Sequence, residues 1–249
     1  MSRLPLTVGI LAKNEQEDLP ACLEQCGFAN EVVILVDTDS SDRTEAIART
    51  SGATVIKRPL QSFAAARNTI LQHASNDWVL FLDVDERMTS ELTRSIQDFL
   101  RNPGVYLGAE ILRQDVFLGR QLRHGDANGW FLRLGCTDAG RWERAVHEVW
   151  EINGPITRLT GVLQHFAHKS VAEYLRKMEF YTDLDAQDTS VTAYWWQLVI
   201  YPVLKFLKVY ILQQGFLDGY PGLVFAILNA RYSYTKRRKL LATRSHHAQ

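Results

Sequence analysis

The sequence lacks an uninterrupted run of about 20 apolar residues, which is the length that a membrane-spanning helix needs. Its N-terminal segment contains no long apolar core, so we do not expect a signal peptide there. Cysteine is scarce, and the irregular spacing of Cys22, Cys26 and Cys136 predicts no disulfide framework. We expect Cys22 and Cys26 to be small buried residues on one face of a helix, in a reducing compartment.

An excess of either charge is also missing, because 28 Lys and Arg balance 28 Asp and Glu. The net charge therefore predicts neither a nucleic-acid partner nor an acidic one. Two phosphate-binding loops are absent as well: GxGxxG does not follow the first predicted strand, and GxxxxGK[ST] occurs nowhere. A dehydrogenase or a P-loop enzyme needs such a loop, so a metal ion would have to bind the phosphates here.

The first hundred residues alternate between short apolar runs and segments with helical spacing. Fully apolar strands that alternate with helices are typical of a parallel sheet covered on both faces. The predicted strands are 6–11, 32–36, 53–57 and 78–82, and the predicted helices are 19–26, 42–52, 62–74 and 90–100. This order predicts a doubly wound α/β domain, in which ligands bind outside the carboxyl ends of the strands.

The remaining residues are less regular. We predict strands at 105–113, 129–134 and 159–166, a loop at 138–148, an amphipathic helix at 170–185 with Ser170 as N-cap, and an apolar helix at 223–234. The segment 194–212 is apolar and aromatic, although Pro202, Lys205 and Lys208 interrupt it. The stretch 231–244 carries six Lys and Arg residues and no acidic residue.

Two carboxylates follow the fourth predicted strand at a spacing of two residues. Within an extended segment, Asp83 and Asp85 point the same way. Carboxylate oxygens are hard ligands that suit Mg²⁺ or Mn²⁺, and such an ion would bridge the protein to a diphosphate. The alternative is that both acids are solvated at the start of a loop, with Glu86 helping to begin the next turn.

Further polar residues follow the first and second predicted strands. Asp37 is placed where a carboxylate can accept hydrogen bonds from a base or a ribose, whereas Asp42 is the expected N-cap of the next helix. Asn14 is a candidate nucleotide contact or a helix cap. Arg67 lies at a helix start rich in small residues, where its guanidinium can face a phosphate.

In this order, the clusters resemble the motifs of family 2 glycosyltransferases with the GT-A fold. The matching segments are LAKNE at 11–15, VDTDSSDRT at 36–44, FAAARN at 63–68 and FLDVDE at 81–86. Later segments, RWERAVHE at 141–148, LQHF at 163–166 and YLRKM at 174–178, are similar to bacterial lipopolysaccharide-core β-glucosyltransferases. Asp39 stands where the family more often has Gly, so either Asp37 or Asp39 could contact the base. Val84 stands where the family more often has Ala.

The resemblance implies a nucleotide-sugar donor, with a UDP-sugar as the expected one. The candidate donor-binding residues are Ala12, Asn14, Glu15, Asp37, Asp39, Arg67 and Asp83. Asp85 is the implied ligand of Mg²⁺ or Mn²⁺, and Asp83 and His165 are further candidate ligands. His165 could instead be a structural histidine, as could His168.

An inverting transfer needs one base near the acceptor. Glu148 stands where the family tends to place its acceptor-side acid and would take the proton from the acceptor hydroxyl, with Glu143 as the alternative. His147 could orient that acid or contact phosphate. The acceptor oxygen would attack the anomeric carbon opposite the departing nucleoside diphosphate. We therefore expect an enzyme that transfers a hexose, glucose by the resemblance, to a glycan or glycolipid acceptor.

The expected fold is an α/β GT-A fold, a Rossmann-like doubly wound mixed sheet, with a C-terminal helical appendage. We expect a catalytic domain at 1–190, with its nucleotide-sugar half at about 1–103 and its acceptor half at about 104–190. Amphipathic helices and a basic tail would form 191–249.

The aromatic, apolar and basic character of this C-terminal segment predicts a membrane-surface anchor. The alternative is a pair of helices that pack on the catalytic domain and end in a solvated tail. An anchored protein would be cytoplasmic and peripheral on the cytoplasmic face of the inner membrane, close to a lipid-linked or lipopolysaccharide-core acceptor.

Two other functions remain open at this point. A nucleotidyltransferase acting on a sugar phosphate would also use a doubly wound sheet, but it usually carries a Gly-rich basic loop where this chain has AKNE. A non-catalytic sugar or lipid binder would not need Asp83, Asp85 and Glu148 together.

Overall fold

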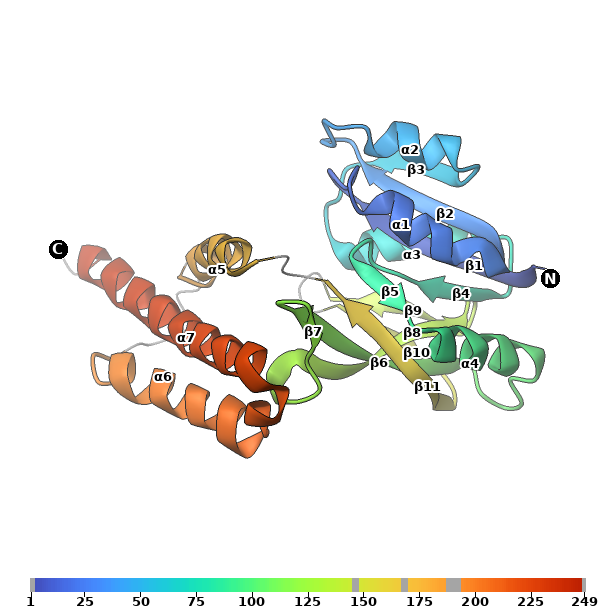
Figure 1. Cartoon of the computed structure of the whole chain (residues 1–249). Helices are drawn as coiled ribbons and strands as arrows, with labels where there is room; N and C mark the ends of the chain where they lie inside the picture. The colour runs from blue at the N-terminus through green and yellow to red at the C-terminus, as the bar shows by residue number, and fades with distance from the viewer. Residues whose placement is uncertain (1–2, 145–147, 167–169, 187–193, 248–249) are drawn as a thin grey trace. The chain divides into compact units, whose positions relative to one another are not determined.

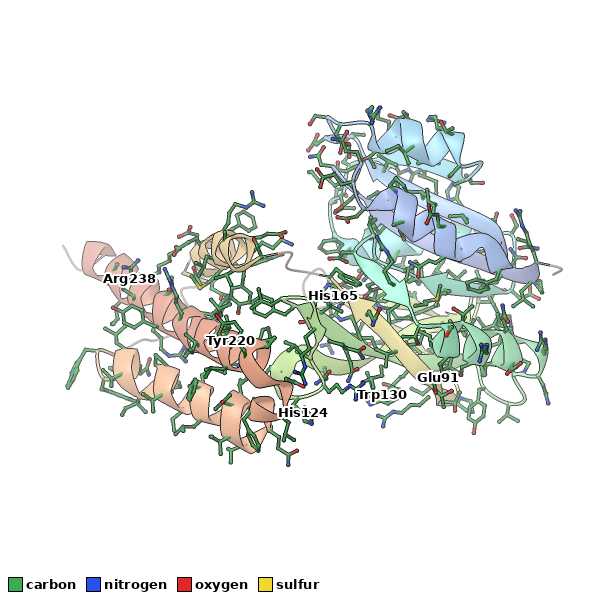
Figure 2. All side chains as sticks on the ribbon, in the orientation of Figure 1. Glu91, His124, Trp130, His165, Tyr220 and Arg238 are labelled. Carbon is green, nitrogen blue, oxygen red and sulfur yellow. The ribbon has the colours of Figure 1, made fainter. Side chains whose placement is uncertain are left out.

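The computed structural model describes residues 3–144, 148–166, 170–186 and 194–247 (Figure 1). The chain forms two compact units. One comprises Met1–Arg113 and Trp130–His165, and the other comprises Gln114–Gly129 and Phe166–Gln249. The boundary predicted near residue 190 stays a prediction. Figure 2 adds the side chains.

The first unit is built on a mixed sheet in which β3, β2, β1 and β4 are parallel neighbours. β8 runs antiparallel beside β4, and β6, β11 and β5 complete the order. The strands are β1 Leu4–Ala12, β2 Ala29–Asp37, β3 Thr54–Arg58, β4 Trp78–Phe81, β5 Glu86–Met88, β6 Gly108–Phe117, β8 Asn128–Cys136 and β11 Ile156–His165. The seven predicted strands are confirmed, and the sequence analysis missed the short β5.

Helices cover both faces of this sheet, as predicted. α1 (Leu19–Glu24), α2 (Thr44–Thr50) and α4 (Ser90–Arg101) pack on one face, and α3 (Phe63–His73) packs on the other. The alternation of buried residues along the strands explains the two layers, because successive side chains of a strand point to opposite faces.

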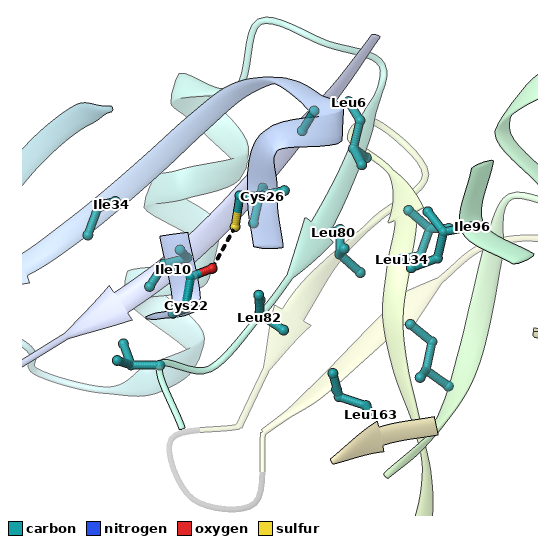
Figure 3. Packing of buried hydrophobic residues seen from close by; sticks show 14 of the residues in the cluster. Leu6, Ile10, Cys22, Cys26, Ile34, Leu80, Leu82, Ile96, Leu134 and Leu163 are labelled. Carbon is teal, nitrogen blue, oxygen red and sulfur yellow. Dashed lines mark hydrogen bonds between the residues drawn. The ribbon is translucent and has the colours of Figure 1, made fainter. Parts of the chain in front are cut away.

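The two layers are separate hydrophobic clusters. The first joins Ile10 and Ile34 to the two cysteines (Figure 3), whereas the second contains Leu35, the neighbour of Ile34. Cys22 and Cys26 are buried free thiols, which confirms their predicted role. The Cys26 thiol donates a hydrogen bond of 3.2 Å to the carbonyl of Cys22, and the Cys22 thiol lies 3.9 Å from the carbonyl oxygen of Asp83.

The helix ends follow local chemistry with one exception. Gly52, with a φ of 80°, follows α2 as predicted. Asp42 is not the N-cap of α2, because Arg43 occupies that position. The Asp42 carboxylate instead accepts hydrogen bonds from the backbone N–H of Thr44 at 2.9 Å and of Gln16 at 3.1 Å. It therefore ties the loop after β2 to the loop after β1.

A two-stranded hairpin replaces part of the predicted loop 138–148. β9 (Gly140–Glu143) pairs antiparallel with β10 (Val149–Ile152). Trp142 and Trp150 face each other across this pair, and their rings stack with centroids 5.4 Å apart. Both indoles also pack edge-on against the phenylalanine at the end of β4. This aromatic packing favours a strand pair that the local polar sequence does not predict.

The second unit is mainly helical. It contains α5 Val171–Ala186, α6 Gln197–Leu207, α7 Gly219–His247, the π-helical turn η3 Lys208–Leu212, the 3-10 turns η2 Gly125–Ala127 and η4 Gly215–Asp218, and the short strand β7 Arg120–Gln121. α7 packs against both α5 and α6. The predicted start of α5 is confirmed, since Ser170 Oγ accepts the backbone N–H of Glu173 at 3.1 Å. None of the described helices is both long and apolar enough to cross a membrane.

The basic stretch 231–244 belongs to α7 and is not a separate solvated tail. Lys236 and Lys239 form ion pairs of 3.0 and 2.8 Å with carboxylates of α5. The guanidinium of Arg237 lies 3.8 Å from the centre of the Tyr201 ring on α6. Part of the predicted basic charge therefore holds the three helices of this unit together.

Candidate active site

The carboxyl ends of β1 and β2 bring several predicted donor-binding residues together. Ala12 ends β1 and Asp37 ends β2, with only 2% of the Asp37 side chain exposed. Lys13 Nζ lies 2.8 Å from Asp37 Oδ2, and the backbone N–H of Asp39 donates to Oδ1 at 3.0 Å. These two hydrogen bonds hold the pKa of Asp37 below its usual range, although burial opposes them. The ionised carboxylate can accept N–H or O–H groups of a ligand, while the Asp39 side chain is 79% exposed.

The loops after β1 and β2 form a single hydrogen-bonded rim. Asn14 has a left-handed φ of 56°, and its Oδ1 accepts the backbone N–H of Ser41 at 2.9 Å. The backbone N–H of Glu15 donates to Thr44 Oγ1 at 2.7 Å. The helix-cap interpretation of Asn14 is wrong, because Asp18 holds the N-cap position of α1. Asn14 instead fixes the rim next to Asp37.

A network of arginines and carboxylates lies at the end of β4. Asp83 Oδ1 accepts Arg67 Nη2 at 3.0 Å, and Asp83 Oδ2 accepts Arg133 Nη2 at 2.7 Å. Arg133 Nη2 also donates to Glu86 Oε1 at 3.0 Å, while Glu86 Oε2 accepts the backbone N–H of Asp83 at 2.9 Å. Both arginine side chains are 5% exposed, and Glu86 is fully buried. Charges buried this deeply are tolerated only when they are paired.

The pKa values of the two carboxyl groups in this network are shifted in opposite directions. Burial acts to raise the pKa of Asp83, but the positive charges of Arg133 and Arg67 outweigh burial and lower it. Burial raises the pKa of Glu86, and the nearby Asp83 charge adds to this rise against the opposing charge of Arg133. Asp83 therefore stays ionised at neutral pH.

Arg67 also connects α3 to the hairpin. Its Nη1 donates to Glu148 Oε1 at 2.5 Å, and its guanidinium lies 4.4 Å from the centre of the Trp142 ring. The next residue, Asn68, makes two further bonds: its Nδ2 donates to the Trp142 carbonyl at 2.8 Å, and its Oδ1 accepts the Trp142 N–H at 2.9 Å. The start of α3 thus fixes the hairpin whose second strand begins directly after Glu148.

A cavity of about 590 Å³ opens in front of this network. It is lined by Arg67, Asp83, Glu110, Arg113, Trp130, Phe131, Leu132, Arg133, Trp142, Glu148, Val149, Trp150 and Ile156. The volume lies in the usual range for small-molecule sites. Glu148 faces this cavity, whereas Glu143 is not among its lining residues and forms an ion pair with Arg141. The geometry favours Glu148 over Glu143, and His147 lies outside the described residues.

Asp85 and His165 meet near the same strand end. His165, the last residue of β11, places Nε2 3.4 Å from Asp85 Oδ2 (His165 is labelled in Figure 2). The described residues contain no group of three or more His, Cys, Asp or Glu that could hold a metal ion alone. One carboxylate and one imidazole do fit Mg²⁺ or Mn²⁺ if diphosphate oxygens and water complete its shell. Asp83 differs from Asp85, because both of its carboxylate oxygens pair with arginines.

Several residues of this cavity and its support were not predicted as site residues from the sequence, among them Arg113, Trp130, Phe131, Arg133 and Asn68. Arg133 lies inside a strand that was correctly predicted, between apolar neighbours. A charged residue in a buried strand requires a buried partner of opposite charge, and this was the available signal. Nothing in the sequence pattern paired it with Asp83, which lies 50 residues away along the chain.

Comparison with known proteins finds related sequences, a similar solved structure and a matching family model. An uncharacterized glycosyltransferase of Rickettsia typhi is 25% identical over 93% of this chain and 85% of its own length. The lipopolysaccharide core biosynthesis glycosyltransferase LpsC of Rhizobium meliloti is 26% identical over 94% of this chain and 93% of its own. A solved mannosyltransferase of Pyrobaculum calidifontis, in complex with GDP-Man and Mn²⁺, covers all of this chain and 81% of its own with a TM-score of 0.48 and 15% identity. A model of the glycosyl transferase family 2 matches residues 7–145, more than half of the chain, so the chain belongs to that family.

Proposed function

We propose that this chain is an inverting, metal-dependent glycosyltransferase that moves a hexose from a nucleoside-diphosphate sugar to a lipid-linked or lipopolysaccharide-core glycan. The observation that carries the proposal is the cavity in which Glu148 and the ionised Asp83 both pair with Arg67. Such a cavity offers one carboxylate as a base and another that stays charged. Family membership and the lipopolysaccharide core relative support the same reaction class.

Glu148 is the proposed base. It accepts the proton of the acceptor hydroxyl while that oxygen forms a bond to the anomeric carbon. The bond from this carbon to the diphosphate breaks, and its electron pair leaves with the diphosphate oxygen. Arg67 holds Glu148 in place and itself stacks on Trp142. Asp83 is placed to accept hydroxyl groups of the donor sugar or its ribose.

The donor is proposed to lie along the strand ends. Asp37 accepts hydrogen bonds from the base or ribose, next to Ala12, Asn14 and Glu15. Asp85 and His165 would hold Mg²⁺ or Mn²⁺, with Asp83 as the further predicted ligand, and the ion would neutralise charge on the leaving diphosphate. UDP-glucose is the first donor to test.

Exposed apolar residues of the second unit support the proposal that the acceptor lies at a membrane surface. Val199, Val203 and Leu207 lie along one face of α6 and are 66%, 53% and 43% exposed. Trp195 and Tyr220 are also exposed and carry the amphipathic rings that favour lipid headgroups. Because part of the basic charge of α7 is paired with α5, we propose that apolar contact with lipid makes the larger contribution to this binding.

The experiment is donor turnover in the purified full chain. UDP-glucose, UDP-galactose and GDP-mannose are incubated with Mn²⁺, with Mg²⁺ or with EDTA, and release of the nucleoside diphosphate is measured. We expect release from one donor, loss of release in EDTA, and a first-formed free sugar of β configuration by proton NMR.

Three outcomes would contradict the proposal. A first-formed α sugar would exclude inversion. Pyrophosphate formation from a nucleoside triphosphate and a sugar 1-phosphate would indicate a nucleotidyltransferase instead. Failure to bind or turn over any nucleotide sugar with any metal would favour a non-catalytic binder.

A further inference from the structure

One wall of the cavity is aromatic. Trp130 and Phe131 on β8 line the cavity and remain 38% and 37% exposed (Trp130 is labelled in Figure 2). An aromatic face carries partial negative charge and attracts the C–H groups of a sugar ring. These two rings therefore offer a surface on which a sugar can stack.

An arginine side chain stacks on each of these rings. The guanidinium of Arg113 on β6 lies 4.3 Å from the centre of the Phe131 ring, and that of Arg158 on β11 lies 4.7 Å from the Trp130 ring. Stacking of this kind holds a guanidinium flat and leaves its N–H edge available to donate hydrogen bonds.

The two arginines differ in how their charge is compensated. Arg158 forms an ion pair of 2.9 Å with Glu110. Among the described residues, Arg113 pairs only with Glu86, at the long distance of 3.7 Å. Glu86 already accepts shorter bonds from Arg133 and from the backbone of Asp83. In the described part of the chain, the guanidinium of Arg113 therefore faces the cavity without a close carboxylate partner, because its ion pair to Glu86 is long.

The weakly engaged N–H groups of Arg113 decide which acceptor fits. An acceptor that stacks on Phe131 removes water from Arg113, and desolvating a guanidinium is unfavourable unless it gains a partner. A neutral sugar supplies only hydroxyl groups. A carboxylate or phosphate supplies two oxygens that match the planar N–H edge of arginine, in the strongest type of hydrogen bond that this side chain makes.

We propose that the wall formed by Trp130, Phe131 and Arg113 is the acceptor subsite, and that it selects an acceptor sugar carrying a carboxylate or phosphate group. This inference rests on the proposed function and names the chemical class of its acceptor. The aromatic rings hold the sugar, Arg113 binds its anionic group, and Glu148 on the opposite part of the same cavity faces the hydroxyl that reacts.

The test is a binding titration of the full chain by NMR, with UDP and diamagnetic Mg²⁺ saturating so that the proposed donor subsite is filled. The probes are methyl β-glucuronide, glucose 6-phosphate and neutral methyl β-glucoside. We expect one of the two anionic probes to bind about ten-fold or more tightly than the neutral one, as charge-assisted hydrogen bonds imply. Whichever anionic probe binds more tightly identifies carboxylate or phosphate as the natural group.

Single substitutions test whether the proposed acceptor subsite is formed by these residues. Arg113→Gln should abolish the preference for the anionic probe, whereas the matched change Arg158→Gln should keep it because Glu110 already neutralises that arginine. Trp130→Ala should weaken all three probes together. Equal affinity of the unmodified chain for the three probes would overturn the inference without need of any variant. Retention of the full preference in Arg113→Gln would overturn it as well.

Failure of the inference and failure of the proposed function are distinguishable. If the chain releases UDP from its donor but does not discriminate between the probes, only the acceptor subsite is wrong. If it turns over no nucleotide sugar, the proposed function is wrong, and a persisting anionic preference would describe a binding protein.

Discussion

The two units differ in the type of residue that lies in an unfavourable environment. The first unit buries charge: Arg67, Arg133 and Glu86 are almost fully enclosed and form a network around Asp83. The second unit exposes apolar groups along α6, where Val199 and other residues face solvent. Both arrangements reduce stability if nothing binds, because buried charge and exposed hydrocarbon are each unfavourable in a folded protein.

The difference between the units indicates where each type of partner binds. Buried, mutually paired charges are positioned in advance and suit a polar substrate whose charge changes during a reaction. Exposed apolar residues suit a surface that is itself apolar. We therefore propose that the chemistry belongs to the first unit and the membrane contact to the second, and each prediction below tests one side of this proposal.

Of the three changes compared next, Asp85→Asn in the first unit is expected to have the largest effect. Loss of a metal ligand should lower donor turnover about 10³-fold, because the ion contributes several kcal/mol to stabilising the leaving group. Rates are measured over a series of Mn²⁺ concentrations, and the melting temperature should stay unchanged. Asp98→Asn, an exposed aspartate on α4, is the matched control. Full turnover by Asp85→Asn would remove this residue from the site.

An intermediate effect is expected from Asn68→Ala. The change leaves the backbone N–H and carbonyl of Trp142 without their partner, so the hairpin and Glu148 should shift. Misplaced catalytic groups lower kcat by about 10- to 100-fold, while donor affinity should change less because Ala12, Asn14 and Asp37 of the proposed donor site lie on other elements. Steady-state kinetics separate the two quantities. A loss of donor affinity with unchanged kcat would contradict a positioning role.

The smallest effect is expected in the second unit. The double change Val203→Glu and Leu207→Glu should weaken binding to phospholipid vesicles about ten-fold by removing apolar contact, measured by flotation. Donor turnover in solution should be unchanged. Val105→Glu, at an exposed apolar residue of the first unit, should float like the unmodified chain. If Arg231→Gln with Arg238→Gln abolishes flotation while the α6 variant does not, charge rather than apolar contact holds the protein at the membrane.

The first hundred residues were the most predictable part of the fold. Their strands are buried on both faces, so apolar runs such as 32–36 identify them directly. The hairpin of β9 and β10 was missed because its stability comes from Trp142 stacking on Trp150 and from Asn68, all of which are tertiary contacts. Such tertiary contacts cannot be predicted from the local sequence.

The candidate site was predictable in part. Residues that end strands, such as Asp37 and Asp83, follow from the rule that ligands bind at the carboxyl edge of a sheet. The choice between Glu143 and Glu148 depends on which side chain faces the cavity, and a one-residue change of register reverses this. Arg113 entered the site only through its place beside Phe131, which requires the strand order of the folded sheet.

The most direct test compares Glu148→Gln with Glu143→Gln in the same donor-turnover assay, with donor binding measured in parallel. Both variants keep the size of the side chain and remove the base. The account predicts that Glu148→Gln binds the donor normally but loses turnover by about 10²- to 10⁴-fold, while Glu143→Gln stays close to the unmodified rate. The reverse result, with Glu143→Gln inactive and Glu148→Gln active, would contradict the assignment of the reaction to the cavity of the first unit.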